Sequence, residues 1–447
     1  MTGDRSADQS RAPRCERPRD VERLAELITG EERALAVGSK TSKSPCFRAD
    51  QLEIGLDHFN QLEIDREQQV ARVGAGVRLS ALLNALREHR LALPTIGEWS
   101  GQTLGGAIST GTHGGSYIYG SLVSSVRAVT FIDGRGELRE VRREDPDFRH
   151  MIPSFGATGV VISYELECEP SFTVSLTRRT VHFSEYLERL LTLVDAESPP
   201  DFKSSIWLPA LDYVVDYEGG RAEDEAVIRA EAPRSLRDER ETRFNSPAVV
   251  LDWLSKQVAR GGRDVLGETW RGRRGLSISR AAARLLGPRD YLGDYDAMIA
   301  PLRGDPEKIL EKRARNKTPP EGEFAVSYEA AGPLINRLRD LFTQEGWYPD
   351  RPVGLRPGAA ESASLVAAQG EPCVWVSLFI YPQNPLMRVL PELLMEHRAR
   401  PHWGKCVFHP LDRIHELYPD WAAFKQRRDE LDPRRVFIND FASSLGL

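Results

Sequence analysis

The segment at residues 100–120 constrains the fold most, because it is long and consists largely of very small residues. It reads SGQTLGGAISTGTHGGSYIYG, and seven of its 21 residues are glycine. Little side-chain bulk blocks the approach to its main-chain N–H groups, and its hydroxyl side chains add donors. Such a loop can hold a pyrophosphate without many cations. Taken alone, the segment could also be an ordinary turn.

Two shorter small-residue loops accompany it. Gly38–Ser42 follows an apolar run at 34–37, and Gly156–Gly159 precedes another at 160–167. No G-x-G-x-x-G follows a strand with a partner acid, so a nucleotide-binding Rossmann unit is not indicated.

The elements around these loops mix helices with strands. Asp20 can cap a helix that carries Leu24, Leu27 and Ile28 on one face. Residues 126–141 alternate around Asp133–Gly136, which is typical of a hairpin. The pattern predicts an α+β domain. Farther along, strands alternate with charged helices, for example at 235–243 and 306–315, but residues 171–320 contain no motif that indicates a function.

Charge and cysteine content exclude several classes of function. Lys plus Arg numbers 60 and Asp plus Glu 66, a net charge of −6, which does not favour binding to nucleic acid. The five cysteines form no C-x-x-C pair, so we expect neither a disulfide framework nor a metal site. The polar N-terminal segment and the absence of long apolar runs predict a cytoplasmic protein without a membrane partner. A monomer or a homodimer is expected.

The order and spacing of the three loops resemble the FAD-binding domain of the vanillyl-alcohol oxidase superfamily. The closest likeness lies in Gly105-Gly106, in Gly111-Thr112-His113-Gly114 and in Ser154–Val161. The C-terminal Arg400-Pro401-His402-Trp403-Gly404-Lys405 is similar to the aldonolactone oxidase branch, which contains gulonolactone, arabinonolactone and alditol oxidases. Further similar segments are Glu323–Val326, Pro352–Arg356, Leu417–Pro419, Leu431–Pro433 and Phe437–Asn439.

The resemblance implies an α+β fold with a two-part FAD-binding domain and a substrate domain built on an antiparallel sheet. We expect a disordered tail at 1–17, the FAD-binding domain at 18–172, the substrate domain at 173–395, and a C-terminal segment at 396–447 that returns to the flavin. Together with the loop chemistry, it implies cofactor contacts from Gly38, Ser39, Lys40, Thr41, Ser42, Thr103, Gly105, Gly106, Ser109, Thr110, Gly111, His113, Gly114, Ser154, Gly156, Gly159 and Val161.

The same resemblance implies hydride transfer from a CH–OH group of a sugar-like substrate to flavin N5, with oxygen as the expected acceptor. Lys405 would stabilise reduced flavin and polarise a substrate oxygen. His402 would accept the hydroxyl proton or shape the site, and Arg356 would face the substrate. Asn439 would place an amide near the ring or cap a turn. His113 is expected in loop packing or cofactor contact, without a role as a base.

Three positions depart from the family pattern. Thr41 stands where covalent members carry the histidine that bonds to flavin, so we expect non-covalent FAD. Gly354 stands where alditol-oxidising members carry an acid two residues before the substrate arginine, so a plain alditol is disfavoured. Phe441 replaces a tyrosine that is frequent in the family. A tailoring step on a sugar, amino sugar or nucleoside in bacterial specialised metabolism would suit these changes.

Two other functions stay open at this point. One is an FAD-dependent dehydrogenase or reductase that uses a partner other than oxygen. The other is a degenerate flavin-binding protein without activity.

Overall fold

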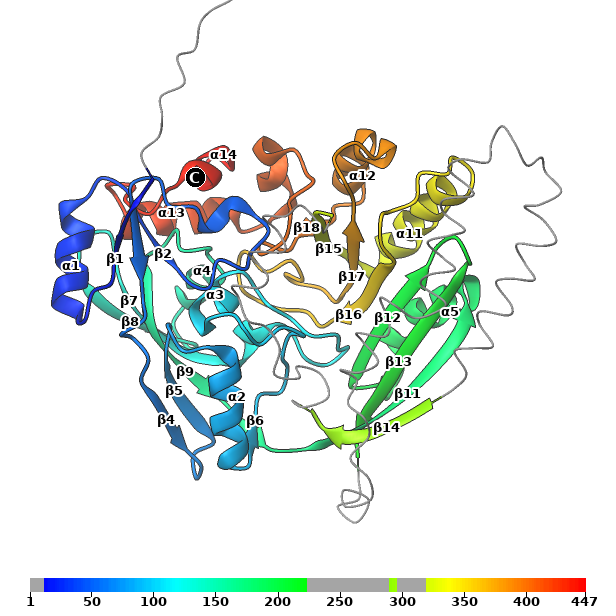
Figure 1. Ribbon diagram of the computed structural model, residues 1–447, viewed down its shortest axis with the longest axis horizontal. Helices are drawn as coiled ribbons and strands as arrows, with labels where there is room; N and C mark the ends of the chain where they lie inside the picture. Colours follow the sequence, from blue (N-terminus) through cyan, green and yellow to red (C-terminus); the bar gives the residue numbers. More distant parts are fainter. Residues whose placement is uncertain (1–11, 223–288, 296–318) are drawn as a thin grey trace, which may run out of the picture.

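The computed structural model describes residues 12–222, 289–295 and 319–447. The helices expected at 235–243 and 306–315 lie outside these ranges. Figure 1 shows the N-terminal elements on one side, a large twisted sheet on the other, and the C-terminal helices α13 and α14 above the N-terminal elements. No helix within the described ranges is long and apolar enough to cross a bilayer.

Two main sheets form the N-terminal half. A parallel sheet has the order β1-β3-β2, and an antiparallel sheet has the order β4-β5-β9-β7-β8. The strands are β1 (Arg14–Glu16), β2 (Ala34–Val37), β3 (Leu52–Gly55), β4 (Leu62–Asp65), β5 (Val70–Gly74), β7 (Val126–Ile132), β8 (Leu138–Arg142) and β9 (Val160–Glu167), and a small pair joins β6 (Leu91–Ala92) to β10 (Glu169–Pro170).

Local sequence explains the helix and the hairpin that we predicted in this half. Helix α1 (Val21–Gly30) begins where the Asp20 carboxylate accepts the Arg23 N–H, and it buries Leu24, Leu27 and Ile28. Strands β7 and β8 form the expected hairpin, since Asp133 Oδ1 accepts the N–H groups of Arg135 and Glu137 in the turn. Both predictions are confirmed.

Ordered structure starts earlier than we expected. Residues 14–16, which we placed in a disordered tail, form β1 and pair in parallel with β3. The Arg14 N–H donates to the Gln51 carbonyl at 2.8 Å, and its guanidinium pairs with Glu31. The open edge of β3 therefore recruits this short segment.

The second half is an eight-stranded sheet with the order β14-β11-β13-β12-β16-β17-β15-β18. The strands are β11 (Thr173–His182), β12 (Phe202–Leu208), β13 (Tyr213–Arg221), β14 (Arg289–Asp294), β15 (Glu321–Ser327), β16 (Val353–Gly358), β17 (Cys373–Phe379) and β18 (Arg400–Pro401). The α-helices within the described ranges are α1, α2 (Leu79–Glu88), α3 (Leu104–Ser109), α4 (Phe148–Met151), α5 (Phe183–Thr192), α11 (Tyr328–Thr343), α12 (Leu390–Glu396), α13 (Trp421–Leu431) and α14 (Asp440–Ser444).

Residue alternation gives the central strands of this sheet two different faces. Leu355, Val376 and Phe324 belong to the core that α5 and α11 complete. The intervening positions hold Arg356, Trp375 and Glu323, which therefore project from the opposite face. The polar face of β15, β16 and β17 is the one that carries the candidate chemistry.

The C-terminal segment contacts both halves. β18 extends the eight-stranded sheet by pairing with β15. Farther on, Val436 and Phe437 pack with α1, and the Ala34 N–H donates to the Val436 carbonyl at 2.8 Å. The chain end thus joins the polar face of the sheet to the N-terminal loops.

Candidate active site

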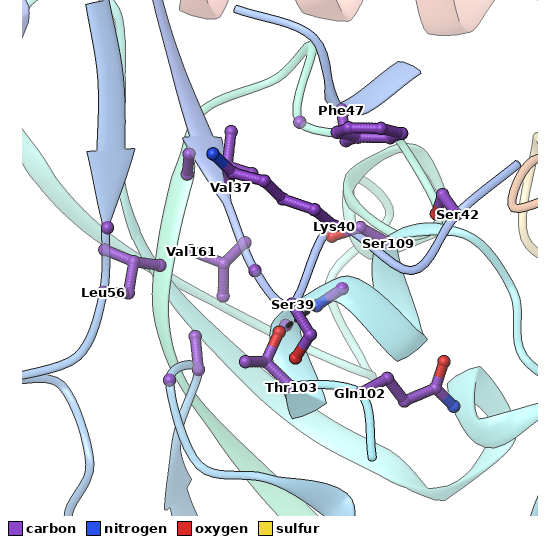
Figure 2. Close-up of a pocket in the computed structure, with 18 of the residues that line it drawn as sticks. Val37, Ser39, Lys40, Ser42, Phe47, Leu56, Gln102, Thr103, Ser109 and Val161 are labelled. Atoms are coloured by element: carbon purple, nitrogen blue, oxygen red, sulfur yellow. Dashed lines mark hydrogen bonds between the residues drawn. The ribbon is translucent and has the colours of Figure 1, made fainter. Parts of the chain in front are cut away.

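A groove in the N-terminal half collects all three small-residue loops (Figure 2). It is lined by residues 38–42 after β2, by residues around α3, and by Gly156, Gly159 and Val161 before and within β9. All the expected dinucleotide contacts line this groove except Gly111, His113, Gly114 and Ser154.

The four exceptions have other surroundings. The Ser154 hydroxyl is buried and accepts a hydrogen bond from Thr158 Oγ1 at 3.0 Å. Gly111 adopts φ of +68° in the turn after α3. Gly114 supplies a carbonyl to His113. These residues shape the loop behind the groove.

Sequence reasoning missed part of the lining. Phe47, Leu56, Arg78, Gln102 and Tyr164 also line the groove. Gln102 lies inside the glycine-rich segment at 100–120, next to Thr103, and the other four lie outside the glycine-rich motifs. Among those four, only the position of Leu56 directly after β3 gave a signal, because ligands commonly bind beyond the ends of strands.

Glycine at position 38 lets the first two loops touch. A Cβ at Gly38 would lie 2.1 Å from Thr103 Oγ1, which is too close for any side chain. Thr103 is fixed in turn, since its hydroxyl accepts the Gly106 N–H and caps α3. Figure 2 shows Ser39 and Thr103 at this junction.

The donors along the groove fit a flavin dinucleotide. Hydroxyls come from Ser39, Ser42 and Ser109, and a cation from Lys40, which pairs with Glu53 at 2.7 Å. Gly106 and Gly156 border the groove with bare main chain. A diphosphate suits this mixture of hydroxyls, main chain and nearby cations, which include Lys40 and Arg78. Thr41, in place of a histidine, also lines the groove.

A second cluster lies at the polar face of β15, next to the groove. A Cβ at Gly404 would lie 3.2 Å from Oγ1 of Thr110, a groove residue, so the C-terminal loop touches the groove wall. Lys405 Nζ lies 2.8 Å from Glu321 Oε1 and 3.5 Å from Glu323 Oε2. Burial lowers the pKa of Lys405, but these two carboxylates outweigh it and raise the pKa above its ordinary value. Lys405 is therefore an ammonium.

Glu323 is a buried carboxylate at the centre of the cluster. Burial would raise its pKa, but Lys405 and His113 outweigh that effect and hold the pKa well below its ordinary value. His113 stacks on Trp375 with ring centroids 3.7 Å apart, and its Nε2 lies 3.7 Å from Glu323 Oε1. His113 thus belongs with the candidate catalytic residues rather than with the groove.

His402 is neutral and oriented as a donor. Its Nδ1 accepts the Gly404 N–H at 2.9 Å, which leaves the ring hydrogen on Nε2. Burial, together with His113 and Lys405, lowers the pKa of His402 to about 3. The expectation that His402 accepts the hydroxyl proton is therefore not supported, because its one lone pair is engaged.

Arg356 lies on the same polar face, on β16. Its guanidinium is 3.3 Å from Glu98 Oε1, and its side chain is 20 % exposed. Two residues earlier, Gly354 pairs across the sheet with Ser377, which pairs in turn with Glu323. Directly paired residues share a face of the sheet. Gly354 therefore shares a row of the sheet with an acid, Glu323, which lies two strands away on β15.

The structure does not bring Asn439 into the cluster. Its Nδ2 donates to the carbonyls of Cys46 at 3.1 Å and Arg48 at 2.9 Å, and its Oδ1 accepts the Ala442 N–H and caps α14. With these contacts made, the side chain joins the C-terminus to the segment after the first loop. Of the two expectations for Asn439, the contacts fit a capping residue and do not fit an amide that faces the flavin.

Glu321 and Glu323 are the residues that sequence reasoning left without a role. The signal was present, since acids at alternate positions at the start of an apolar strand must share one face. What the sequence did not give was the strand order that sets this face beside Lys405.

His113, Glu323 and His402 also offer ligand atoms within 4.8 Å of one another, a spacing that a metal ion could use. The ammonium of Lys405, 3.5 Å from Glu323, already neutralises that carboxylate. The Nδ1 of His402 is also engaged with Gly404. The cluster is better suited to binding through hydrogen-bond donors than through a metal.

Comparisons with known proteins agree with this geometry. Residues 14–142 match a family described as FAD binding domain, and residues 313–445 match D-arabinono-1,4-lactone oxidase. L-gulono-1,4-lactone dehydrogenase of Mycobacterium tuberculosis is 26 % identical over 95 % of this chain and 94 % of the relative. A long-chain alcohol oxidase of an uncultured marine euryarchaeote is 27 % identical over 93 % of this chain and 90 % of the relative.

Solved structures give the same fold. Cholesterol oxidase from B. sterolicum superimposes with a TM-score of 0.69 at 15 % identity, over 96 % of this chain and 93 % of that one. The two matched segments are the regions of the chain that supply most of the groove and the loop of Lys405. The chain is an FAD-dependent oxidoreductase and belongs to the aldonolactone oxidase branch of the vanillyl-alcohol oxidase superfamily.

Proposed function

We propose that this enzyme oxidises a ring CH–OH group of a sugar lactone to a carbonyl. The observation that carries the proposal is a set of three donors, the buried His402 and the partly exposed Lys405 and Arg356, at a sheet face that adjoins the groove. FAD, when bound in the groove, supplies the acceptor for the hydride.

The residues of the cluster divide into donors and one central acceptor. Lys405 is an ammonium and His402 carries its hydrogen on Nε2, so both hold a substrate oxygen rather than remove a proton. Glu323 is the ionised acceptor beside Lys405, and we assign to it the hydrogen bond from the substrate hydroxyl and the proton that this hydroxyl gives up as the hydride leaves carbon. Fixing that oxygen aligns the C–H bond with the acceptor.

The substrate class follows from the donors and from the relatives. Cationic donors suit the carbonyl oxygen of a lactone, and position 354 lacks the acid that would grip an additional polyol hydroxyl. A relative that spans nearly the whole chain is named for L-gulono-1,4-lactone. We therefore favour lactones over plain alditols.

The acceptor for the second half-reaction has two candidates. We expected oxygen, and of two relatives that each match 95 % of this chain, one is named a dehydrogenase and the other, from Scyliorhinus torazame, an oxidase. Hydrogen peroxide formed per lactone consumed distinguishes the two. One peroxide per lactone supports an oxidase, and turnover that needs an added dye or protein acceptor supports a dehydrogenase.

Anaerobic bleaching of the flavin tests the proposal directly. Purified protein should be yellow, and L-gulono- or D-arabinono-1,4-lactone should bleach its absorbance. Bleaching only by a nicotinamide donor would instead indicate a reductase. A yellow protein that no lactone, polyol or nicotinamide bleaches would indicate a flavin-binding protein without this activity.

We also propose that FAD binds without a covalent bond, because Thr41 offers no imidazole at the first loop. Acid precipitation should leave all the flavin in the supernatant. Flavin that remains with the denatured pellet after washing would contradict this prediction.

A further inference from the structure

The carboxylate of Glu321 lies between two ammonium groups that come from opposite ends of the chain. Its Oε1 is 2.8 Å from Lys405 Nζ and accepts from Ser377 Oγ at 3.2 Å, and its Oε2 pairs with Lys43 Nζ. The side chain of Glu321 is 13 % exposed. One carboxylate thus serves two cations in a largely buried place.

The main chain fixes this arrangement. The Lys43 N–H donates to the Gly404 carbonyl at 2.8 Å, and the Cys406 N–H donates to the Glu321 carbonyl at 2.8 Å. Between the two acids, a Cβ at Gly322 would lie 2.3 Å from the Phe408 ring, so the strand is pressed against the C-terminal loop. Lys43 directly follows residues 38–42 of the groove. Glu321 therefore connects the cofactor loop, the sheet and the loop of Lys405.

Charge explains why an acid is needed here. If the carboxyl group were neutral, no negative charge would offset the repulsion between the two ammonium groups that contact it. Burial would raise the pKa of Glu321, but Lys405 and Lys43 outweigh it and lower the pKa to about 2, so the acid is ionised at neutral pH. Among the residues that the structure describes, the other charged or titratable groups that act on Lys405 or lie beside it are Glu323, Arg356 and His402, and His113 adjoins His402.

We infer that Glu321 is a positioning residue that sets the place and the charge of the Lys405 ammonium, and that Lys43 weakens this hold through their shared carboxylate. The inference rests on the proposed function, in which Lys405 holds a substrate oxygen. Because the two partners of Glu321 carry like charge, removing Glu321 and removing Lys43 should change Lys405 in opposite directions.

The first variant is Glu321→Gln, which keeps the shape and removes the charge. Losing an adjacent opposite charge should lower the pKa of Lys405 by roughly one to three units. The alkaline limb of kcat should move to lower pH by the same amount, while kcat at neutral pH falls about tenfold or more and KM changes less. Glu321→Asp should recover most of the alkaline limb, because it restores the charge.

The second variant is Lys43→Met. It removes a like charge from the shared carboxylate, so the pKa of Lys405 and the alkaline limb should rise. A disturbance of packing alone would not move the alkaline limbs of the two variants in opposite directions. The matched control is Glu165→Gln on β9, an acid of similar exposure at 17 % that pairs with Arg72 and Arg142. It should leave the pH profile unchanged.

Chemical labelling of Lys405 measures the pKa of its ammonium group without catalytic turnover. Acetic anhydride is applied to each purified, flavin-loaded protein across a range of pH, and the modified peptide is quantified by mass spectrometry. The midpoint for Lys405 should fall in Glu321→Gln and rise in Lys43→Met. Equal midpoints, or shifts of the same sign, overturn the role of Glu321. Failure of wild-type protein to be reduced by any lactone instead overturns the proposed function and leaves the labelling result readable.

Discussion

At the scale of single residues, Lys405 is the group on which the proposed chemistry depends most. Lys405→Met keeps the length of the side chain and removes the ammonium. Reduction of bound flavin by a lactone should slow by about 100-fold or more, as for loss of a preorganised donor. The flavin should stay bound, because Lys405 does not line the groove.

Stopped-flow measurement at saturating lactone checks this prediction, with flavin content determined on the same sample. The control is Lys425→Met on α13, a partly exposed lysine that pairs with Asp429 at 3.8 Å. Unchanged reduction in Lys405→Met would remove Lys405 from the chemistry. Loss of flavin would assign it to cofactor binding instead.

His402 illustrates a limit of sequence reasoning at this scale. The motif around Lys405 marked the histidine as functional, but a sequence does not state which ring nitrogen carries the hydrogen. That depends on the Gly404 N–H, which donates to Nδ1 across a tight turn. The same turn makes His402 a donor and excludes the role as base that residue type alone suggested.

At the scale of elements, the groove depends on the contact between the loop after β2 and the start of α3. Gly38→Ala would place a methyl group 2.1 Å from Thr103 Oγ1, so one loop must move. Affinity for FAD should fall about tenfold or more, since both loops line the groove. Titration of flavin-free protein with FAD measures the change.

A second substitution makes that prediction specific. Thr103→Ala removes the clashing oxygen and leaves Cβ at 3.3 Å, so Gly38→Ala with Thr103→Ala should bind FAD more tightly than Gly38→Ala alone. Gly30→Ala, at a glycine with no atom within 4 Å of its Cβ, is the control and should bind FAD normally. If the double variant binds FAD no more tightly than Gly38→Ala, the clash with Thr103 is not the cause of the lost affinity.

Elements with local signals were the ones the sequence could predict. The Asp20 cap, the turn at Asp133 and the three glycine loops each depend on residues close together in the chain. The cluster around Lys405 depends on the register of β16, β17 and β15, which joins Gly354, Ser377 and Glu323 in one row. Such pairings are non-local, so neither Glu321 nor Glu323 could be assigned before the fold was known.

At the scale of the whole molecule, Asn439 ties the C-terminus to the segment that follows the first loop. Asn439→Ala removes the cap of α14 and leaves the carbonyls of Cys46 and Arg48 without this donor. Stability should fall by about 2 kcal/mol, from the lost cap and the unsatisfied groups. Chemical denaturation measures this, with Asn84→Ala on α2 as control. Reduction of bound flavin below the unfolding temperature should stay within about twofold, because a catalytic amide would lose far more.

The two halves also meet at Glu361, and this contact makes the stability of the whole molecule depend on pH. The carboxyl group follows β16 and accepts from Ser121 Oγ, in the N-terminal half, at 2.7 Å. Burial raises the pKa of Glu361 from 4.5 to about 7, although the hydrogen bond from Ser121 opposes the shift. The folded protein therefore binds this proton more tightly than the unfolded chain does. The stability that this bound proton adds to the folded protein is complete below about pH 4.5 and is lost as the pH rises through 7.

Glu361→Gln should abolish this dependence, because the amide keeps an acceptor for Ser121 and never ionises. At pH 8 the variant should melt at a higher temperature than wild-type protein, and at pH 4.5 the difference should vanish or change sign. Scanning calorimetry at both pH values measures the two differences. Glu63→Gln on the exposed edge strand β4 should follow wild-type protein throughout. A variant that melts lower than wild-type protein at pH 8 would mean that the junction of the two halves needs the charged carboxylate.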